Sequence, residues 1–209
     1  MEIKMAIEPI TNYYINGSKQ WERWGVNNIL HREDGPAFIA YYESGILKQE
    51  LWYFNGKYHR ADGPAAILYY ESGMIEQEQW FLSDILHRVD GPSLISYYSS
   101  GVIKETEFFV NSNHHREDGP ATIWYYESGK IELERWIVNN ERHREEGPEY
   151  ICYYESGEIK EEDWYINNKR INSNKIKEYK SWLIDNNLYN KSYSHWFDEE
   201  KVLWKLRWV

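Results

Sequence analysis

Apolar and polar residues form short runs in this chain that recur with a period of 28 residues. In one copy, Ala37–Tyr42 is an aliphatic and aromatic run of the kind that favours a β-strand, and Leu47–Phe54 is a second such run. Between the runs lie Glu43, Ser44 and Gly45, a compact turn with glycine where a positive φ would be needed. The pattern therefore predicts one β-hairpin in each repeat.

The period holds without insertion or deletion, because a Tyr-Tyr pair, a glycine three residues later and a His-Arg-x-Asp/Glu-Gly-Pro block all keep the same phase. Self-similarity at a period of this size is typical of tandem arrays. The block residues, for which we predict a structural turn, are His31, Arg32, Asp34, Gly35, Pro36, His59, Arg60, Asp62, Gly63, Pro64, His87, Arg88, Asp90, Gly91, Pro92, His115, Arg116, Asp118, Gly119, Pro120, His143, Arg144, Glu146, Gly147 and Pro148.

The turn length suggests a pairing register. A three-residue loop pairs Tyr41 with Leu47 and places them, with Ile39, on one face of the sheet, while Glu50 and Trp52 would lie on the other. This assignment is sensitive to the register, because a slip of one residue moves every side chain to the opposite face. Rings on both faces favour a narrow single layer.

The ends of the chain depart from the repeat. Residues 1–30 are predicted to be an N-terminal cap with a degenerate half-repeat, 31–170 to be five repeats, and 171–209 to be a C-terminal cap. Within that cap, 173–187 has a helical pattern that Ser173 would cap, and 196–208 resembles a worn terminal hairpin. The expected fold is mainly all-β: tandem antiparallel hairpins in an elongated single-layer sheet, closed by a short helix and a hairpin.

The composition of the chain argues against several classes of function. The formal charge of −10 argues against direct binding of nucleic acid and against an anionic membrane surface. The sequence shows neither a secretory leader nor an apolar run near the ~20 residues of a membrane span, and Cys152 occupies a variable packing position. We therefore expect a cytoplasmic protein, in the host cytoplasm if the chain is viral, with no membrane insertion.

The repeated block is the only candidate for chemistry, and its repetition argues against an active site. Equivalent histidines two strands apart are separated by about 9.5 Å, too far to share a metal ion. Active sites are normally single and asymmetric. We predict no catalytic residue, no metal and no cofactor. Arg32 and Asp34 are expected to pair, and His31 to stack on a tryptophan; a row of Arg and His that meets an acidic or peptide partner is the alternative.

Aromatic rings recur at fixed positions and have two interpretations. They form the core of the array, or they form an open row that stacks sugars or contacts a protein. A row of glutamates recurs at Glu50, Glu78, Glu134 and Glu162, with Thr106 interrupting it. This row is expected to be a solvated face, or a surface that attracts a basic partner. The candidate binding face comprises Trp24, Trp52, Trp80, Phe108, Trp136, Trp164, Tyr42, Tyr70, Tyr98, Tyr126 and Tyr154.

The repeat resembles a known family. The segment Asn55–Ala65 and the Tyr-Tyr-x-Ser-Gly element are similar to MORN-type repeats, in the variant found in giant-virus proteins and some bacterial antitoxin-like proteins. The similarity covers about residues 13–170 and ends beyond Ile171. It implies stacked antiparallel hairpins and protein or lipid binding rather than catalysis.

The first hypothesis is a non-enzymatic scaffold or adaptor that binds another protein through a sheet face, with self-association through sheet edges also open. The second is an acidic virus- or phage-encoded inhibitor that blocks a basic, nucleic-acid-binding surface of a host or defence protein. The third is a carbohydrate-binding module that uses the Trp and Tyr rows.

Overall fold

The main secondary structure consists of antiparallel strands joined in hairpins, as a computed structural model describes for residues 8–144 and 147–186. The expectation of an antiparallel sheet built from hairpin repeats, with one short helix near the C-terminal end of the described chain, is confirmed. The twelve main strands are β1 (Ile10–Tyr13), β2 (Lys19–Arg23), β5 (Phe38–Tyr41), β6 (Leu47–Leu51), β9 (Ala66–Tyr69), β10 (Ile75–Gln79), β13 (Leu94–Tyr97), β14 (Ile103–Glu107), β17 (Thr122–Tyr125), β18 (Ile131–Arg135), β21 (Tyr150–Tyr153) and β22 (Ile159–Asp163).

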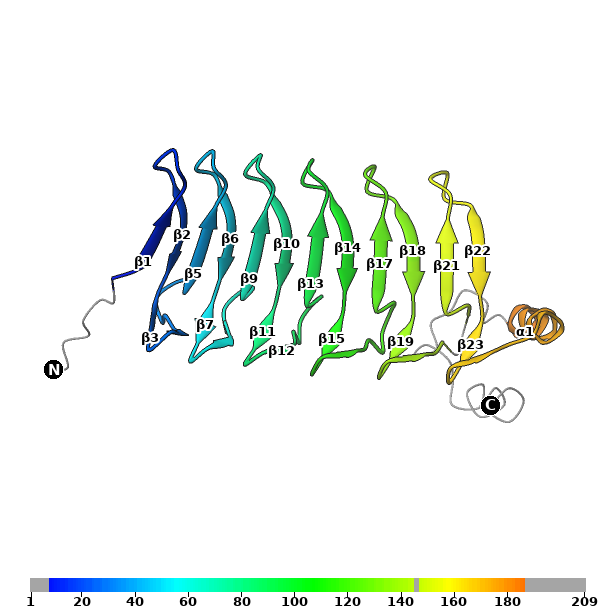
Figure 1. Ribbon diagram of the computed structural model, residues 1–209. Coiled ribbons are helices and arrows are strands. Elements are labelled where there is room, and N and C mark those ends of the chain that lie inside the picture. Colours follow the sequence, from blue (N-terminus) through cyan, green and yellow to red (C-terminus); the bar gives the residue numbers. More distant parts are fainter. Residues whose placement is uncertain (1–7, 145–146, 187–209) are drawn as a thin grey trace. The chain divides into compact units, whose positions relative to one another are not determined.

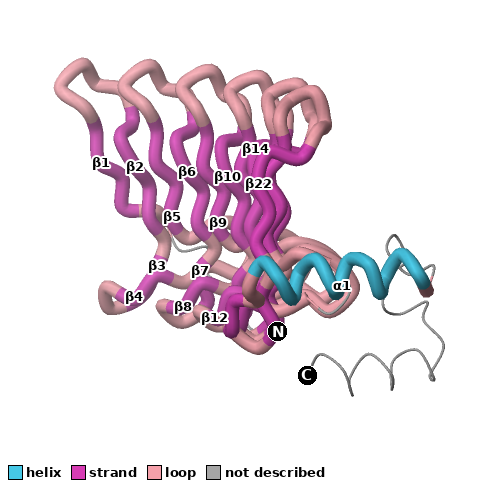
Figure 2. The backbone as a smooth tube through the Cα atoms, turned by 90° about the vertical axis from the view of Figure 1, so that its right-hand side faces the viewer, coloured by secondary structure: helices cyan, strands magenta, loops and turns pink. Residues whose placement is uncertain are grey.

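Contacts divide the chain into two compact units. The first contains Met1–Ser112 with Glu127–Gly129, and the second contains Asn113–Tyr126 with Lys130–Val209. In the first unit, the main strands from β1 to β14 stand side by side in chain order and form one layer (Figures 1 and 2). In the second, β17, β18, β21 and β22 pair successively in the same way.

A second hairpin in each repeat was missed by the sequence analysis, which treated Leu47–Phe54 as one strand. The main strand ends at Leu51. Tyr53–Phe54 then pair with Lys57–Tyr58 in a short hairpin that turns away from the sheet (Figure 2). Its turn residues, such as Asn55 and Gly56, have positive φ, as a tight hairpin turn requires. The short strands are β3 (Gly25–Val26), β4 (Ile29–Leu30), β7 (Tyr53–Phe54), β8 (Lys57–Tyr58), β11 (Phe81–Leu82), β12 (Ile85–Leu86), β15 (Phe109–Val110), β16 (Asn113–His114), β19 (Ile137–Val138), β20 (Glu141–Arg142), β23 (Tyr165–Ile166) and β24 (Lys169–Arg170).

The register of the main hairpin is partly as expected. Tyr41 pairs with Leu47, which confirms the three-residue loop, but the register then shifts and Ile39 pairs directly with Glu50. Lys48 is the extra residue of this β-bulge, and an extra residue reverses the alternation of faces along the bulged strand. The prediction that Glu50 and Trp52 face away from Ile39 is therefore wrong.

The N-terminal half-repeat keeps this geometry. Tyr13 pairs with Lys19 and the register shifts at the same point of the hairpin, while Gly17 has a φ of 86°. At the other end, helix α1 (Ser173–Asp185) begins one residue earlier than the predicted cap at Ser173 implies. The N-cap is Asn172, whose side chain accepts a hydrogen bond from the Lys175 N–H, and not Ser173. The predicted terminal hairpin at 196–208 lies outside the described residues.

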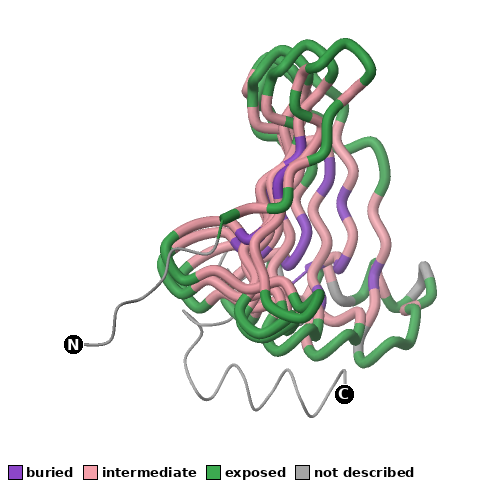
Figure 3. Tube along the Cα trace, turned by 60° about the vertical axis from the view of Figure 1, so that its left-hand side comes forward, coloured by how far each residue is buried: buried purple, intermediate pink, exposed green. Residues whose placement is uncertain are grey.

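The core of each unit is thin and lies along the strands, whereas the hairpin tips are exposed (Figure 3). Its most deeply buried residues occupy one position of the repeat, just after the proline of the block. The residues at this position are Ala37, Ala65, Ser93, Ala121 and Glu149, all 0% exposed.

None of the helices in the described part of the chain is both long and apolar enough to cross a membrane.

Candidate functional site

The repeated block forms a compact side-chain clamp. In its first copy, the Arg32 guanidinium lies 4.2 Å from the centre of the Trp24 ring, and its Nε donates to the Asp34 carboxylate at 2.8 Å. Arg32 also donates to the Pro36 carbonyl oxygen, which holds both ends of the turn. A Cβ on Gly35 would meet the guanidinium at 3.0 Å, so the glycine makes room for the arginine. The expected Arg–Asp pair is present.

The clamp recurs with nearly the same geometry. Arg60, Arg88 and Arg144 lie 4.3, 4.2 and 3.6 Å from their tryptophan ring centres, at Trp52, Trp80 and Trp136. The Arg60 guanidinium lowers the pKa of the Asp62 carboxyl, through a hydrogen bond and its charge.

A structural repeat is counted here from a main hairpin to the end of the block that follows its short hairpin. The histidine of each block then contacts the next repeat, and not a tryptophan. The Nδ1 atom of His31 accepts a hydrogen bond from the Asn55 backbone N–H at 3.0 Å, and its ring lies 4.7 Å from the Phe54 ring. The prediction that His31 stacks on a tryptophan is wrong, because the arginine that follows it occupies the tryptophan face.

The two tyrosines of each pair also join successive repeats. The hydroxyl of Tyr69 donates to Glu50 at 2.5 Å, and the hydroxyl of Tyr42 donates to the Tyr69 carbonyl oxygen at 2.7 Å. Burial, followed by the hydrogen bond to Glu50, raises the pKa of Tyr69. The glutamate row is thus an inter-repeat acceptor row, and the expectation of a simply solvated face is wrong. Equivalent Tyr–Glu pairs are Tyr41 with Glu22, Tyr97 with Glu78, and Tyr153 with Glu134.

The candidate binding face from the sequence therefore consists mainly of residues engaged within the array. The tryptophan rings described above lie under guanidinium groups, and Trp164 is 1% exposed. The Tyr70 and Tyr126 hydroxyls donate to main-chain carbonyl oxygens of the next repeat, as the Tyr42 hydroxyl does. Tyr154, in the last repeat, is exposed. Phe108 and Tyr98 also make interactions.

One repeat carries a charged residue in the core. Glu149 stands where other copies have alanine or serine, and it is fully buried. Arg142, which replaces Leu30 of the first copy, donates to the Glu149 carboxylate at 2.8 Å, and the Arg135 guanidine Nε lies 4.0 Å from it. Burial raises the pKa of Glu149, against the lowering effect of Arg142. This pair was not predicted from the sequence, although the sequence shows a glutamate where the other copies have alanine or serine.

Helix α1 closes the last repeat with one lysine. Lys180 Nζ forms an ion pair with Glu162 and lies 5.5 Å from the centre of the Trp164 ring. In the four other copies that have a glutamate and a tryptophan at these positions, a tyrosine hydroxyl contacts the glutamate and an arginine covers the tryptophan. Lys180 thus supplies both contacts where the repeat pattern ends.

The register separates the strand residues into two classes. One face, here called the framework face, carries the row in which Glu22, Ile39, Glu50 and Ile67 pair successively. The same residue types recur in later repeats, except that Thr106 takes the place of one glutamate. The opposite face, here called the variable face, carries residues that vary between copies. In the first unit the variable face comprises Trp21, Arg23, Phe38, Ala40, Gln49, Leu51, Ala66, Leu68, Gln77, Gln79, Leu94, Ser96, Glu105 and Glu107.

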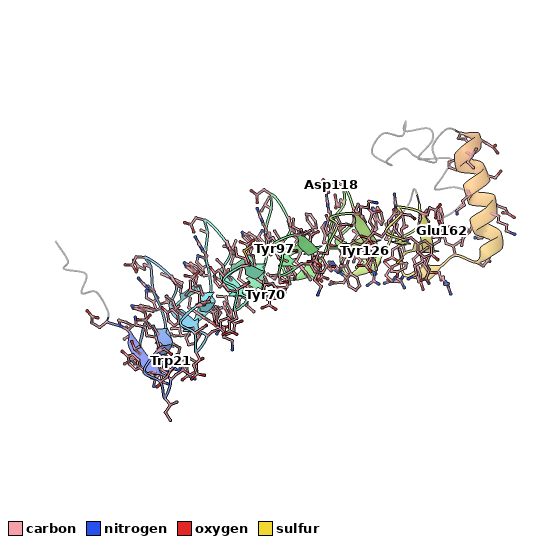
Figure 4. The ribbon with its side chains drawn as sticks, turned by 90° about the horizontal axis from the view of Figure 1, so that it is seen from above. Trp21, Tyr70, Tyr97, Asp118, Tyr126 and Glu162 are labelled. Atoms are coloured by element: carbon pink, nitrogen blue, oxygen red, sulfur yellow. The ribbon has the colours of Figure 1, made fainter. Side chains whose placement is uncertain are left out.

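Side chains on the variable face of the first unit are mostly half-buried and mixed in character. Gln79 donates to the Gln77 amide oxygen at 2.6 Å, and Gln77 donates to the Ser96 hydroxyl at 3.1 Å, so the centre is an amide-rich network. In Figure 4, Trp21 and Tyr70 project on one side of the sheet and Tyr97 on the other. This surface offers hydrogen-bonding groups beside apolar area.

The second unit has its own variable face with an exposed tryptophan. Trp124 pairs across the strands with Leu133, which pairs in turn with Cys152. Trp124 is 43% exposed, whereas its cross-strand neighbour Leu133 is 6% exposed. The Arg135 guanidinium lies 5.5 Å from the centre of the Tyr150 ring on the same face. An exposed aromatic ring beside a buried aliphatic side chain resembles the anchors that dominate protein interfaces.

The described residues contain no cluster of three or more His, Cys, Asp or Glu side chains positioned to hold a metal ion. Cys152 is a free cysteine and half-buried. No protein-family model matches this sequence, and no curated protein matches it significantly.

Proposed function

We propose that this protein is a non-enzymatic interaction protein that binds another protein through the variable face. The observation that carries the proposal is the division between the two faces: the recurring polar side chains bond one repeat to the next, and most strand positions on the opposite face vary between copies. Residues that build an array must be alike in every copy, whereas residues that recognise an asymmetric partner must differ. The resemblance to MORN-type repeats supports the same class of function.

The test uses the intact chain as bait in cell lysate at two salt concentrations. Leu68→Arg and Trp124→Ser alter the variable face in each unit, and Glu71→Arg, at an exposed hairpin tip, is the matched charge control. We expect partners that the wild type captures to be lost with a variable-face change and kept with the control. Partners retained by both variable-face variants would place the binding surface elsewhere.

A second candidate rests on exposed carboxylates. Asp34, Asp62 and Asp90 recur along the block with side chains 84%, 84% and 86% exposed, in a chain of net charge −10. Such a row suits a basic protein surface and supports the inhibitor hypothesis. Binding that weakens strongly with salt, and that nucleic acid competes for, would favour this candidate over the variable face.

A further inference from the structure

The block histidines show one repeated hydrogen-bonding arrangement. In four copies, the Nδ1 atom accepts a hydrogen bond from a backbone N–H that lies 24 residues further along, in the next repeat. The N···Nδ1 distances are 3.0 Å for His31 and 3.3 Å for His87. The four pairs are His31 with Asn55, His87 with Asn111, His115 with Asn139, and His143 with Asn167.

This arrangement requires an unprotonated Nδ1. A neutral imidazole has one nitrogen that donates and one that accepts, whereas a protonated imidazole donates from both. Protonation would therefore set an Nδ1–H against a backbone N–H and remove an inter-repeat hydrogen bond. Histidine is the side chain that ordinarily changes charge in the mildly acidic range.

We propose that the block histidines make the repeat array acid-sensitive, by uncoupling successive repeats when their Nδ1 atoms are protonated. Each histidine carries one such contact between a repeat and the next, so the effect is multiplied along each unit. The protein would be stable near neutrality and lose inter-repeat coupling in a mildly acidic compartment, whichever partner it binds.

The charged neighbours of these histidines differ. The Nε2 atoms of His31 and His115 lie 3.8 and 3.7 Å from the Glu33 and Glu117 carboxylates. These pairs are exposed on the carboxylate side and so are weak. Val89 takes the place of that glutamate beside His87.

His59 provides an internal control. Its Nδ1 atom lies 3.5 Å from the Ser83 hydroxyl, which donates to a neutral ring and accepts from a protonated one. His114 is similarly tolerant, because its Nε2 atom lies 3.2 Å from the Ala121 carbonyl oxygen and 2.9 Å from the Thr122 hydroxyl. The described structure therefore separates acid-sensitive histidines from tolerant ones.

The test is thermal unfolding at about pH 7.5 and about pH 5.5, across which histidine ordinarily titrates. Asparagine keeps an acceptor oxygen near the Nδ1 position and does not titrate. We expect the wild-type melting temperature to fall by roughly 5 °C or more, since one ordinary hydrogen bond shifts it by roughly 2–4 °C in a chain of this size. The H31N/H87N/H115N/H143N variant should lose most of that fall, and H59N should retain it.

Three results would overturn the proposal: an unchanged wild-type melting temperature, an undiminished fall in the fourfold variant, or a fall that H59N removes as fully. If the fourfold variant does not fold, amide hydrogen exchange of the wild type decides. The Asn111 amide should lose protection by roughly an order of magnitude between the two pH values, corrected for intrinsic exchange, while the Ile67 amide of the main sheet does not. Equal behaviour of the two amides would also contradict the proposal.

Discussion

The two faces of the main sheet are made by alternate residues of the same strands, and they differ in how much the copies vary. Ile67 on the framework face has an isoleucine counterpart in every complete repeat, whereas its neighbour Leu68 is replaced by alanine, serine, tryptophan and cysteine in other copies. The framework face carries the Tyr–Glu pairs. Hydrogen bonding between repeats therefore restricts the residues on the framework face, whereas the residues on the variable face are less restricted.

The largest expected effect comes from paired substitutions at these neighbouring positions. Ile67→Ala removes a 9% exposed side chain from the framework and should lower the free energy of unfolding by about 3 kcal/mol. Leu68→Ala, on the half-buried variable face, should cost about 1 kcal/mol. Chemical denaturation of the two variants measures the difference, and equal costs would break the distinction between the faces.

The next effect concerns Glu149, the buried glutamate at a position where the other copies have alanine or serine. Glu149→Ala leaves Arg142 without its carboxylate and should cost about 2 kcal/mol, less than for a fully buried pair because Arg142 is partly exposed. The double variant Glu149→Ala/Arg142→Leu recreates the residues of the first repeat and should recover most of that loss. A double variant no more stable than the single one would mean that the charged pair is not the cause.

A smaller effect is expected from loss of one Tyr–Glu hydrogen bond between repeats. Tyr97→Phe removes the hydroxyl that donates to Glu78 at 2.7 Å and should cost about 1–2 kcal/mol. Tyr154→Phe, at an exposed position of the last repeat, serves as the control and should change stability little. Similar losses of stability in the two variants would argue against an energetic role for the Tyr–Glu hydrogen bonds.

The smallest effect concerns the end of the array. Lys180→Ala removes the ion pair with Glu162 and the contact with Trp164, and should cost about 0.5–1 kcal/mol. Lys180→Arg keeps both kinds of contact and should stay near the wild type in the same denaturation measurement. Loss of stability in the arginine variant alone would contradict this assignment.

The repeat, the hairpins and the Tyr41–Leu47 loop could be predicted from the sequence, because each depends on local residue types. The faces could not, since the bulge at Lys48 arises from pairing between strands and leaves no mark in the hydrophobic pattern. The short hairpin at Asn55 and Gly56 has a recognisable turn signal, but the residues after that turn were not predicted to form a strand. The arginine on Trp24 was missed because ring contacts between turn and strand depend on the folded path.

The lysine on helix α1 has a consequence for how such a chain changes in length. A duplication of 28 residues upstream of β22 adds a copy whose side chains already match both neighbours, so the new junctions resemble the old ones. A duplication that displaced the helix would leave the final tryptophan and glutamate without the cation that covers them. Gain or loss of a whole internal repeat would therefore keep these contacts, whereas an insertion between β22 and α1 would break them.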